Sequence, residues 1–101
     1  MRERDIEAYL VKQVKATGGE VRKVKWIGRR GAPDRIVMLP ALVLKDRPCV
    51  LAAKTFWVEL KAPGVAPEAH QVREHKRMRA MGQSVVVIDS LEAVDFHLGP
   101  F

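Results

Sequence analysis

The sequence predicts a single domain of the α/β class, in which helices and strands form separate layers. The chain has 101 residues, a length that suits one domain and leaves no room for a second. Apolar residues make up 48% of it, enough for one modest core. Amphipathic segments alternate with β-branched runs in the order helix, three strands, helix and strand, followed by a short helix. Residues 1–101 are therefore expected to form one α/β unit.

The first predicted element is an amphipathic helix over residues 4–17, which ends at two glycines. Its apolar stripe repeats every four residues, at Ile6, Leu10 and Val14. Glu7 lies on the same side, one turn before Leu10. A buried carboxylate needs a partner, which a metal ion or Lys61 would supply. At the edge of the stripe, Glu7 would instead reach water.

The remaining elements follow from β-branched runs and from the residues that interrupt them. Four strands are predicted, over residues 21–27, 34–39, 55–60 and 84–89. Pro67 suits the first position of a helix that runs to residue 81 and ends before Gly82. A last short helix fits residues 91–96. Residues 40–54 are compatible with a hairpin or with a loop that contains one helical turn.

Composition narrows the class of function. Lys and Arg number 18 against 12 Asp and Glu, and a small basic domain is drawn to polyanions, most often nucleic acid. The same surplus can also serve solubility alone. No apolar stretch is long enough to span a membrane, and no signal peptide is evident, so we expect a cytoplasmic protein without a membrane partner. Cys49 is the only cysteine, which fits a reducing compartment.

Residues that can carry chemistry lie at the ends of two predicted strands. Glu59 and Lys61 are two positions apart, so they project side by side while Leu60 turns into the core. Asp34 opens another strand. Carboxylates bind a divalent metal, and a neighbouring ammonium orients water or stabilises charge on a phosphate, as phosphodiester hydrolysis requires. Alternatively, Glu59 and Lys61 form a surface ion pair and Asp34 is a turn residue.

A second Glu-x-Lys pattern, Glu74-His75-Lys76, tests how specific this spacing is. It falls within the second predicted helix, where residues two positions apart do not face each other. Strand context therefore favours Glu59 and Lys61 as the functional pair. His75 is expected to be partly buried in the core, and no histidine is assigned a catalytic role.

Several motifs in a fixed order resemble one nuclease family. The motifs are Trp26-Ile27-Gly28, Gly31-Ala32-Pro33-Asp34, Phe56-Trp57-Val58-Glu59-Leu60-Lys61 and then Gln71. They resemble the VRR-NUC nuclease domain of the PD-(D/E)xK, or restriction-endonuclease-like, superfamily. The resemblance spans residues 7 to about 90 and implies a mixed sheet flanked by helices in the order αβββαβ. Residues 40–54 depart from it, being longer than a minimal turn.

The resemblance implies a role for each matching residue and no small-molecule cofactor. Mg²⁺ or Mn²⁺ would be held by Asp34, Glu59, the backbone carbonyl of Leu60 and Glu7. Lys61 would position the attacking water and stabilise the pentavalent phosphate. Gln71 would touch the phosphate or a water on the metal. Gly28 and Gly31 bracket Arg29 and Arg30, which suits close approach to DNA or a flexible loop.

Basic residues before and after these positions are candidates for DNA contacts. They are Arg22, Lys23, Lys25, Arg29 and Arg30 before the Asp34 strand, and Arg73, Lys76 and Arg77 on the second helix. Phosphate contacts of this kind position DNA without reading its sequence, although a run of charges is also typical of a solvated face.

The resemblance implies a metal-dependent, structure-specific DNA endonuclease. It would cleave branched DNA such as Holliday junctions as a homodimer and leave a 5′-phosphate. Apolar side chains of residues 40–54, which include Leu42, Leu44, Val50 and Leu51, would form the dimer surface or fold onto their own core. The alternatives are a nuclease of flap, nicked or linear DNA, a non-catalytic basic module that binds nucleic acid, and a toxin-like or regulatory interaction domain.

Overall fold

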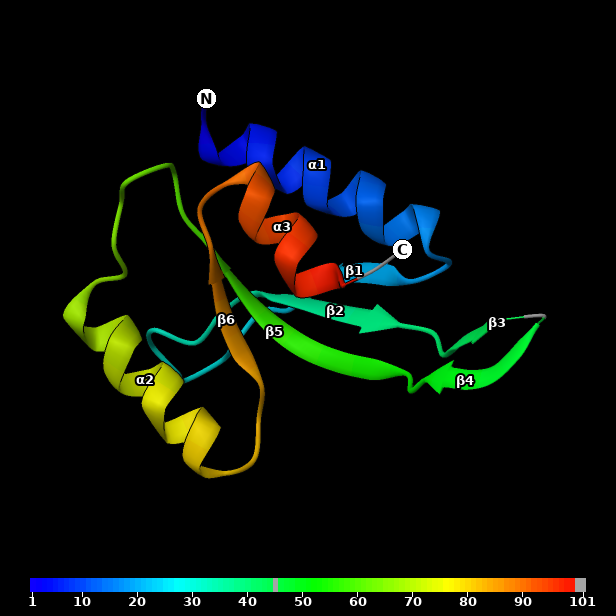
Figure 1. The fold of residues 1–101 in the computed structure, drawn as a ribbon. Helices are drawn as coiled ribbons and strands as arrows, with labels where there is room; N and C mark the ends of the chain where they lie inside the picture. Colours follow the sequence, from blue (N-terminus) through cyan, green and yellow to red (C-terminus); the bar gives the residue numbers. More distant parts are fainter. Residues whose placement is uncertain (45, 100–101) are drawn as a thin grey trace.

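The structure, a computed structural model, describes residues 1–44 and 46–99. Its elements in chain order (Figure 1) are α1 (Glu3–Ala16), β1 (Glu20–Lys23), β2 (Arg35–Leu39), β3 (Leu42–Leu44), β4 (Arg47–Leu51), β5 (Lys54–Leu60), α2 (Ala69–Ala80), β6 (Val85–Ile88) and α3 (Leu91–Leu98). The predicted order is confirmed, with a two-stranded hairpin inserted before β5. None of the helices in this described part is long and apolar enough to cross a membrane.

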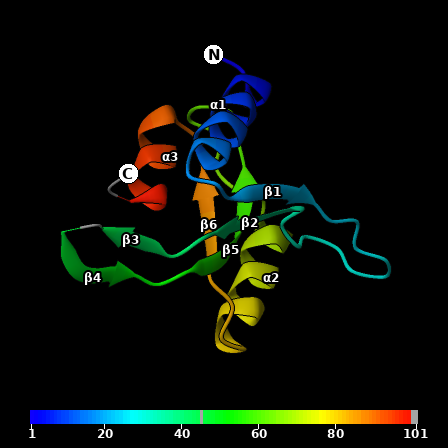
Figure 2. The ribbon, with the colours of Figure 1, turned by 90° about the vertical axis from the view of Figure 1, so that its right-hand side faces the viewer.

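The main sheet is mixed and has the strand order β1-β2-β5-β6. β1 pairs antiparallel with β2, and β2 pairs antiparallel with β5. β5 and β6 are parallel, because α2 carries the chain back between them. α1 and α3 cover one face of the sheet and α2 lies on the other (Figures 1 and 2). This is the predicted α/β restriction-endonuclease-like arrangement.

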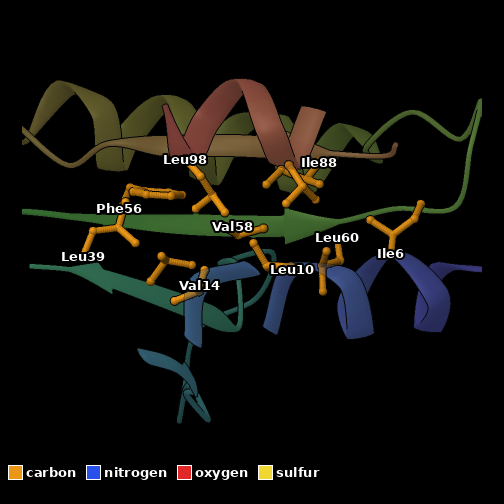
Figure 3. Packing of buried hydrophobic residues seen from close by; sticks show 11 residues of the cluster. Ile6, Leu10, Val14, Leu39, Phe56, Val58, Leu60, Ile88 and Leu98 are labelled. Carbon is orange, nitrogen blue, oxygen red and sulfur yellow. The ribbon is translucent and has the colours of Figure 1, made fainter. Parts of the chain in front are cut away.

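The apolar core lies between the sheet and the α1–α3 layer. Ile6, Leu10 and Val14 of α1 are fully buried, as their spacing predicts. They meet Phe56, Val58 and Leu60 of β5 (Figure 3). Since side chains alternate along a strand, the residues between these three, among them Glu59, face α2 instead. The alternation of β5 thus separates the core from the layer that carries chemistry.

Residues 40–44 and 46–54 include the paired strands β3 and β4, so the hairpin is the one of the two predicted alternatives that forms. Leu42 pairs with Leu51, and the register shifts between Val43 and Leu44. The hairpin extends from the end of the sheet where β2 finishes and β5 begins (Figure 1). The side chains of Val43 and Leu51 are exposed. The side chains of Leu44, Cys49 and Val50 lie outside the described residues.

Two predicted boundaries are wrong for local reasons. α2 begins at Ala69 rather than Pro67, because the side-chain oxygen of Gln71 accepts a hydrogen bond from the Glu68 N–H at 2.9 Å and makes Glu68 the N-cap. β1 ends at Lys23 rather than at residue 27. The chain turns away there, and the indole N–H of Trp26 donates to the Pro33 carbonyl at 2.8 Å, which closes a loop over residues 24–34.

Candidate active site

The register of the sheet places Asp34 opposite Glu59. Arg35 pairs with Val58, so the next position of the same antiparallel ladder sets Asp34 against Glu59, with both side chains on one face. Lys61 follows directly after β5, where its N–H donates to the Ile88 carbonyl at 3.0 Å and continues the parallel ladder. The three residues predicted to carry the chemistry therefore gather at one end of the sheet.

Glu59 is the most perturbed carboxylate of this group. Burial raises the pKa of Glu59 to about 7, the Lys61 ammonium acts in the opposite direction, and the Asp34 carboxylate adds to the rise. A carboxylate held this way gains stability from an added cation. Binding of a cation next to Glu59, Lys61 and Asp34 would therefore be favourable.

His75 of α2 contacts Glu59 directly and was not predicted to do so. Its Nε2 lies 3.1 Å from Glu59 Oε1, and the residue is only 1% exposed. Burial lowers the pKa of His75, and the contact between its ring and the Glu59 carboxyl group fixes the orientation of that carboxyl group. The partial burial expected of His75 is an underestimate. A signal was present, since His75 lies three positions before Met78, the apolar residue that α2 buries.

Arg35 is the partner of Glu7, where a metal ion or Lys61 was expected. The alternation of β2 places Arg35 on the buried face with Val37 and Leu39, beneath α1. Its guanidinium donates a hydrogen bond to Glu7 and forms an ion pair with Asp34 at 2.9 Å. Arg35 therefore links the first helix to the strand end that carries Asp34. The sequence pattern that indicates this contact is an arginine at the same alternating positions as the buried strand residues Val37 and Leu39.

The donor set fits a hard divalent cation. Asp34, Glu59 and the Leu60 carbonyl are oxygen donors, which Mg²⁺ prefers, and Mg²⁺ keeps several of its waters. Glu7 reaches the group through Arg35. Throughout residues 1–44 and 46–99, no set of three or more His, Cys, Asp or Glu side chains is grouped so as to hold a metal ion. Two carboxylates and one carbonyl would leave the other positions around a bound Mg²⁺ to water.

Gln71 has a structural contact in addition to its predicted role. Its side-chain oxygen caps α2, as described above, which holds the start of the helix in place. Its predicted approach to the phosphate stays a prediction. The cap lies on the same helix as His75, so Gln71 also helps to set the layer that faces Glu59.

The basic residues fall into three groups by their surroundings. Lys23 and Lys25 line a pocket with Val24, Trp26, Ala32 and Asp34, so positive charge lies next to the predicted site. Arg29 and Arg77 instead bind Glu74, at 2.9 Å and 2.7 Å, while Arg22 pairs with Glu20 at 2.9 Å. Arg30, Arg73 and Lys76 are exposed.

Glu74 is a buried carboxylate with a full set of partners. It is 2% exposed on α2, between Arg29 of the loop and Arg77 of its own helix. Burial alone would raise the pKa of Glu74, but the hydrogen bonds from the two arginines outweigh it and hold that pKa below its ordinary value. Glu74 therefore stays charged and ties the loop over residues 24–34 to α2.

Glycine is required at position 31 because of packing within the protein, whereas close approach to DNA was one of the predicted explanations. Its φ is +86°, and a Cβ there would lie 2.7 Å from the His70 carbonyl oxygen. Only glycine lets the loop pack so tightly on the start of α2. Gly28 also has a positive φ, +72°, but a Cβ there would meet open space.

Comparison with known proteins agrees with this geometry. A protein of Acyrthosiphon pisum secondary endosymbiont phage 1, named "Putative nuclease p44", is 43% identical over 90 residues, which cover 89% of this chain and 85% of that protein. A solved structure described as "VRR_NUC domain" superposes with a TM-score of 0.73 at 36% identity, covering 95% of this chain and 92% of the other. No sequence profile of a known family matches the chain.

The mixed sheet, with Asp34, Glu59 and Lys61 at one end, defines the class of restriction-endonuclease-like nucleases. The likeness to the VRR_NUC structure covers nearly all of both chains. The protein belongs to the VRR-NUC nuclease family.

Proposed function

We propose that the protein is a divalent-metal-dependent endonuclease that hydrolyses phosphodiester bonds in DNA. The observation that carries this proposal is the burial of Glu59 close to the charges of Lys61 and Asp34, at the end of the sheet where Arg35 pairs with Val58. Glu59 is desolvated and coupled electrostatically to both of the others. Carboxylates can hold a metal ion, and the metal ion and a nearby ammonium can stabilise negative charge on the phosphate in the transition state.

The chain's own residues divide the work of the reaction. Mg²⁺ or Mn²⁺, when bound by Asp34, Glu59 and the Leu60 carbonyl, would supply Lewis-acid stabilisation of the scissile phosphate. Lys61 would hold the attacking water and balance negative charge on the pentavalent phosphate. His75 holds the Glu59 carboxylate in one orientation, and Arg35 holds Asp34. A 5′-phosphate product is proposed from the family likeness.

Branched DNA, such as a Holliday junction, is the proposed substrate. Lys23 and Lys25 stand beside Asp34 in one pocket, which would place a phosphate backbone along the site. Arg30, Arg73 and Lys76 are exposed and add charge without base-reading groups. Such contacts favour recognition of DNA shape over sequence.

The metal requirement is tested with a panel of labelled DNAs: a four-way junction, a flap, a nicked duplex and a linear duplex. With Mg²⁺ or Mn²⁺ we expect the four-way junction to be cut fastest, and with EDTA no cleavage. Product ends are read by phosphatase and ligase treatment. Cleavage that persists in EDTA would contradict the mechanism. Binding without cleavage under every condition would favour a non-catalytic binding module, and preferred cutting of flaps or nicks would reassign the substrate.

We also propose that the hairpin of β3 and β4 mediates a homodimer. Val43 is 69% exposed on the hairpin and Leu51 is also exposed, at the end of the sheet away from Asp34. A substitution Val43→Glu is expected to shift the sedimentation coefficient from dimer to monomer, because charge would have to be buried in the contact. Val11→Glu, at an exposed position of α1, serves as the control. A monomeric wild-type protein would overturn the proposal.

A further inference from the structure

Ile27 is exposed to solvent in the loop over residues 24–34. It is 92% exposed, more than any other large apolar side chain in the described part of the chain. An isoleucine in this position contributes nothing to the core and presents its whole side chain to solvent. The loop leaves the sheet between Lys23 and Arg35, the end at which Asp34 and Glu59 meet, and projects away from the body of the protein (Figure 2).

The loop behind Ile27 is fixed at several points. Trp26, the residue before it, donates to the Pro33 carbonyl at 2.8 Å, and its ring lies 5.2 Å from the ring of Trp57 on β5. Arg29 is bound to the buried Glu74 at 2.9 Å. Gly31 packs against the His70 backbone. The exposed isoleucine is therefore presented by an anchored loop.

The surroundings of Ile27 indicate what it meets. Lys25 and Arg30 lie on either side of it in the loop, and Lys25 lines the same pocket as Asp34. A ligand that satisfies these groups is anionic outside and apolar inside. DNA has this construction, with phosphates on the surface and stacked bases within. An intact duplex hides the base faces, so an apolar side chain can reach them only where stacking is weak or interrupted.

We propose that Ile27 is a wedge that enters the base stack of DNA where stacking is interrupted, which makes the loop over residues 24–34 the element that selects substrate shape. The proposal rests on the proposed nuclease function and adds to it a specificity-determining residue. The Ile27 side chain keeps the bases at the branch point unstacked while Lys25 and Arg30 bind the flanking phosphates. The scissile phosphate is thereby set at the end of the sheet that carries Asp34 and Glu59.

The test uses a four-way junction with 2-aminopurine at the branch point, whose fluorescence rises when the base unstacks. Binding is measured in EDTA, so the readout does not depend on cleavage. Wild-type protein is expected to raise the fluorescence at the branch point, and Ile27→Ala to abolish most of the rise. In Mg²⁺, Ile27→Ala should lower the ratio of junction to linear-duplex cleavage rates about 10-fold, as loss of a wedge that offsets unstacking predicts. Ile27→Leu should restore both readouts.

Two further variants separate this inference from the function on which it rests. Phe96→Ala removes another exposed apolar side chain, from α3 on the opposite face of the sheet, and should behave as wild type. Lys61→Ala should lose cleavage but keep the fluorescence rise. If Ile27→Ala matches wild type in fluorescence and in the cleavage ratio, the wedge is excluded while the nuclease stands. If wild type does not cleave but raises the fluorescence in an Ile27-dependent manner, the nuclease proposal fails and the wedge stands.

Discussion

Replacing Lys61 with alanine is expected to lower the rate of DNA cleavage by about 10²–10³-fold, the usual effect of removing one stabilising group from a transition state. Lys61 is the cationic side chain that follows Glu59 on the same face, and its main chain is held by the Ile88 carbonyl. Its side chain is only partly buried, so the loss should fall on chemistry and leave folding intact. Single-turnover cleavage of a saturating DNA substrate measures the chemical step directly.

Two control variants make the result interpretable. Lys12→Ala removes an exposed lysine from α1, on the other side of the sheet, and is expected to cleave at the wild-type rate. Lys61→Arg keeps the positive charge in a longer, planar group and should recover only part of the activity. If Lys61→Ala retained a rate within a few-fold of wild type, Lys61 would have no part in the reaction.

Replacing Arg35 with methionine is expected to lower the free energy of unfolding by about 2 kcal/mol, a typical loss for hydrogen bonds to charged groups. Methionine preserves much of the apolar stem of Arg35 and removes its charge. The Arg35 side chain is 10% exposed and pairs with two carboxylates, Glu7 and Asp34, which the substitution would leave without their shared positive partner. Urea unfolding monitored by tryptophan fluorescence measures the change.

A matched control exists on the neighbouring strand. Arg22 forms an ion pair with Glu20 at the same 2.9 Å separation as Arg35 with Asp34, but its side chain is 62% exposed. Arg22→Met should therefore cost no more than about 0.5 kcal/mol. Mg²⁺ should stabilise Arg35→Met more than wild type, because a cation would relieve the repulsion that the substitution creates. Equal losses for the two variants would show that burial of Arg35 carries no weight.

Much of the fold can be predicted from the spacing of apolar residues within single helices and strands. The four-residue repeat of Ile6, Leu10 and Val14 predicts α1 and its buried face, and both are observed. Leu60 of β5 lies in the apolar core, as predicted from the alternation of side chains along a strand. These features depend on the period of one element, which the sequence displays directly.

The contacts between different helices and strands could not be predicted from the spacing of residues along the chain. Glu7 was expected to need a partner, but the partner is Arg35, 28 residues away, which only the packing of α1 on β2 brings near. His75 meets Glu59 because α2 returns across the sheet. Glu74-His75-Lys76 lies within α2, as predicted, and two of its residues make contacts that spacing does not reveal: His75 with Glu59, and Glu74 with Arg29.

The way α2 is attached has a consequence for motion. α1 docks through a continuous apolar stripe, whereas α2 buries only Glu74, His75 and Met78 and is held largely by ion pairs and by the two hydrogen bonds from Arg79 to the Val85 carbonyl. Segments with little apolar burial open before the rest of a domain unfolds. Amide hydrogens of α2 should then exchange by a subglobal opening that ionic strength promotes, while those of α1 exchange only on global unfolding. Release of α2 would loosen the orientation of Glu59, because His75 of α2 contacts that carboxyl group.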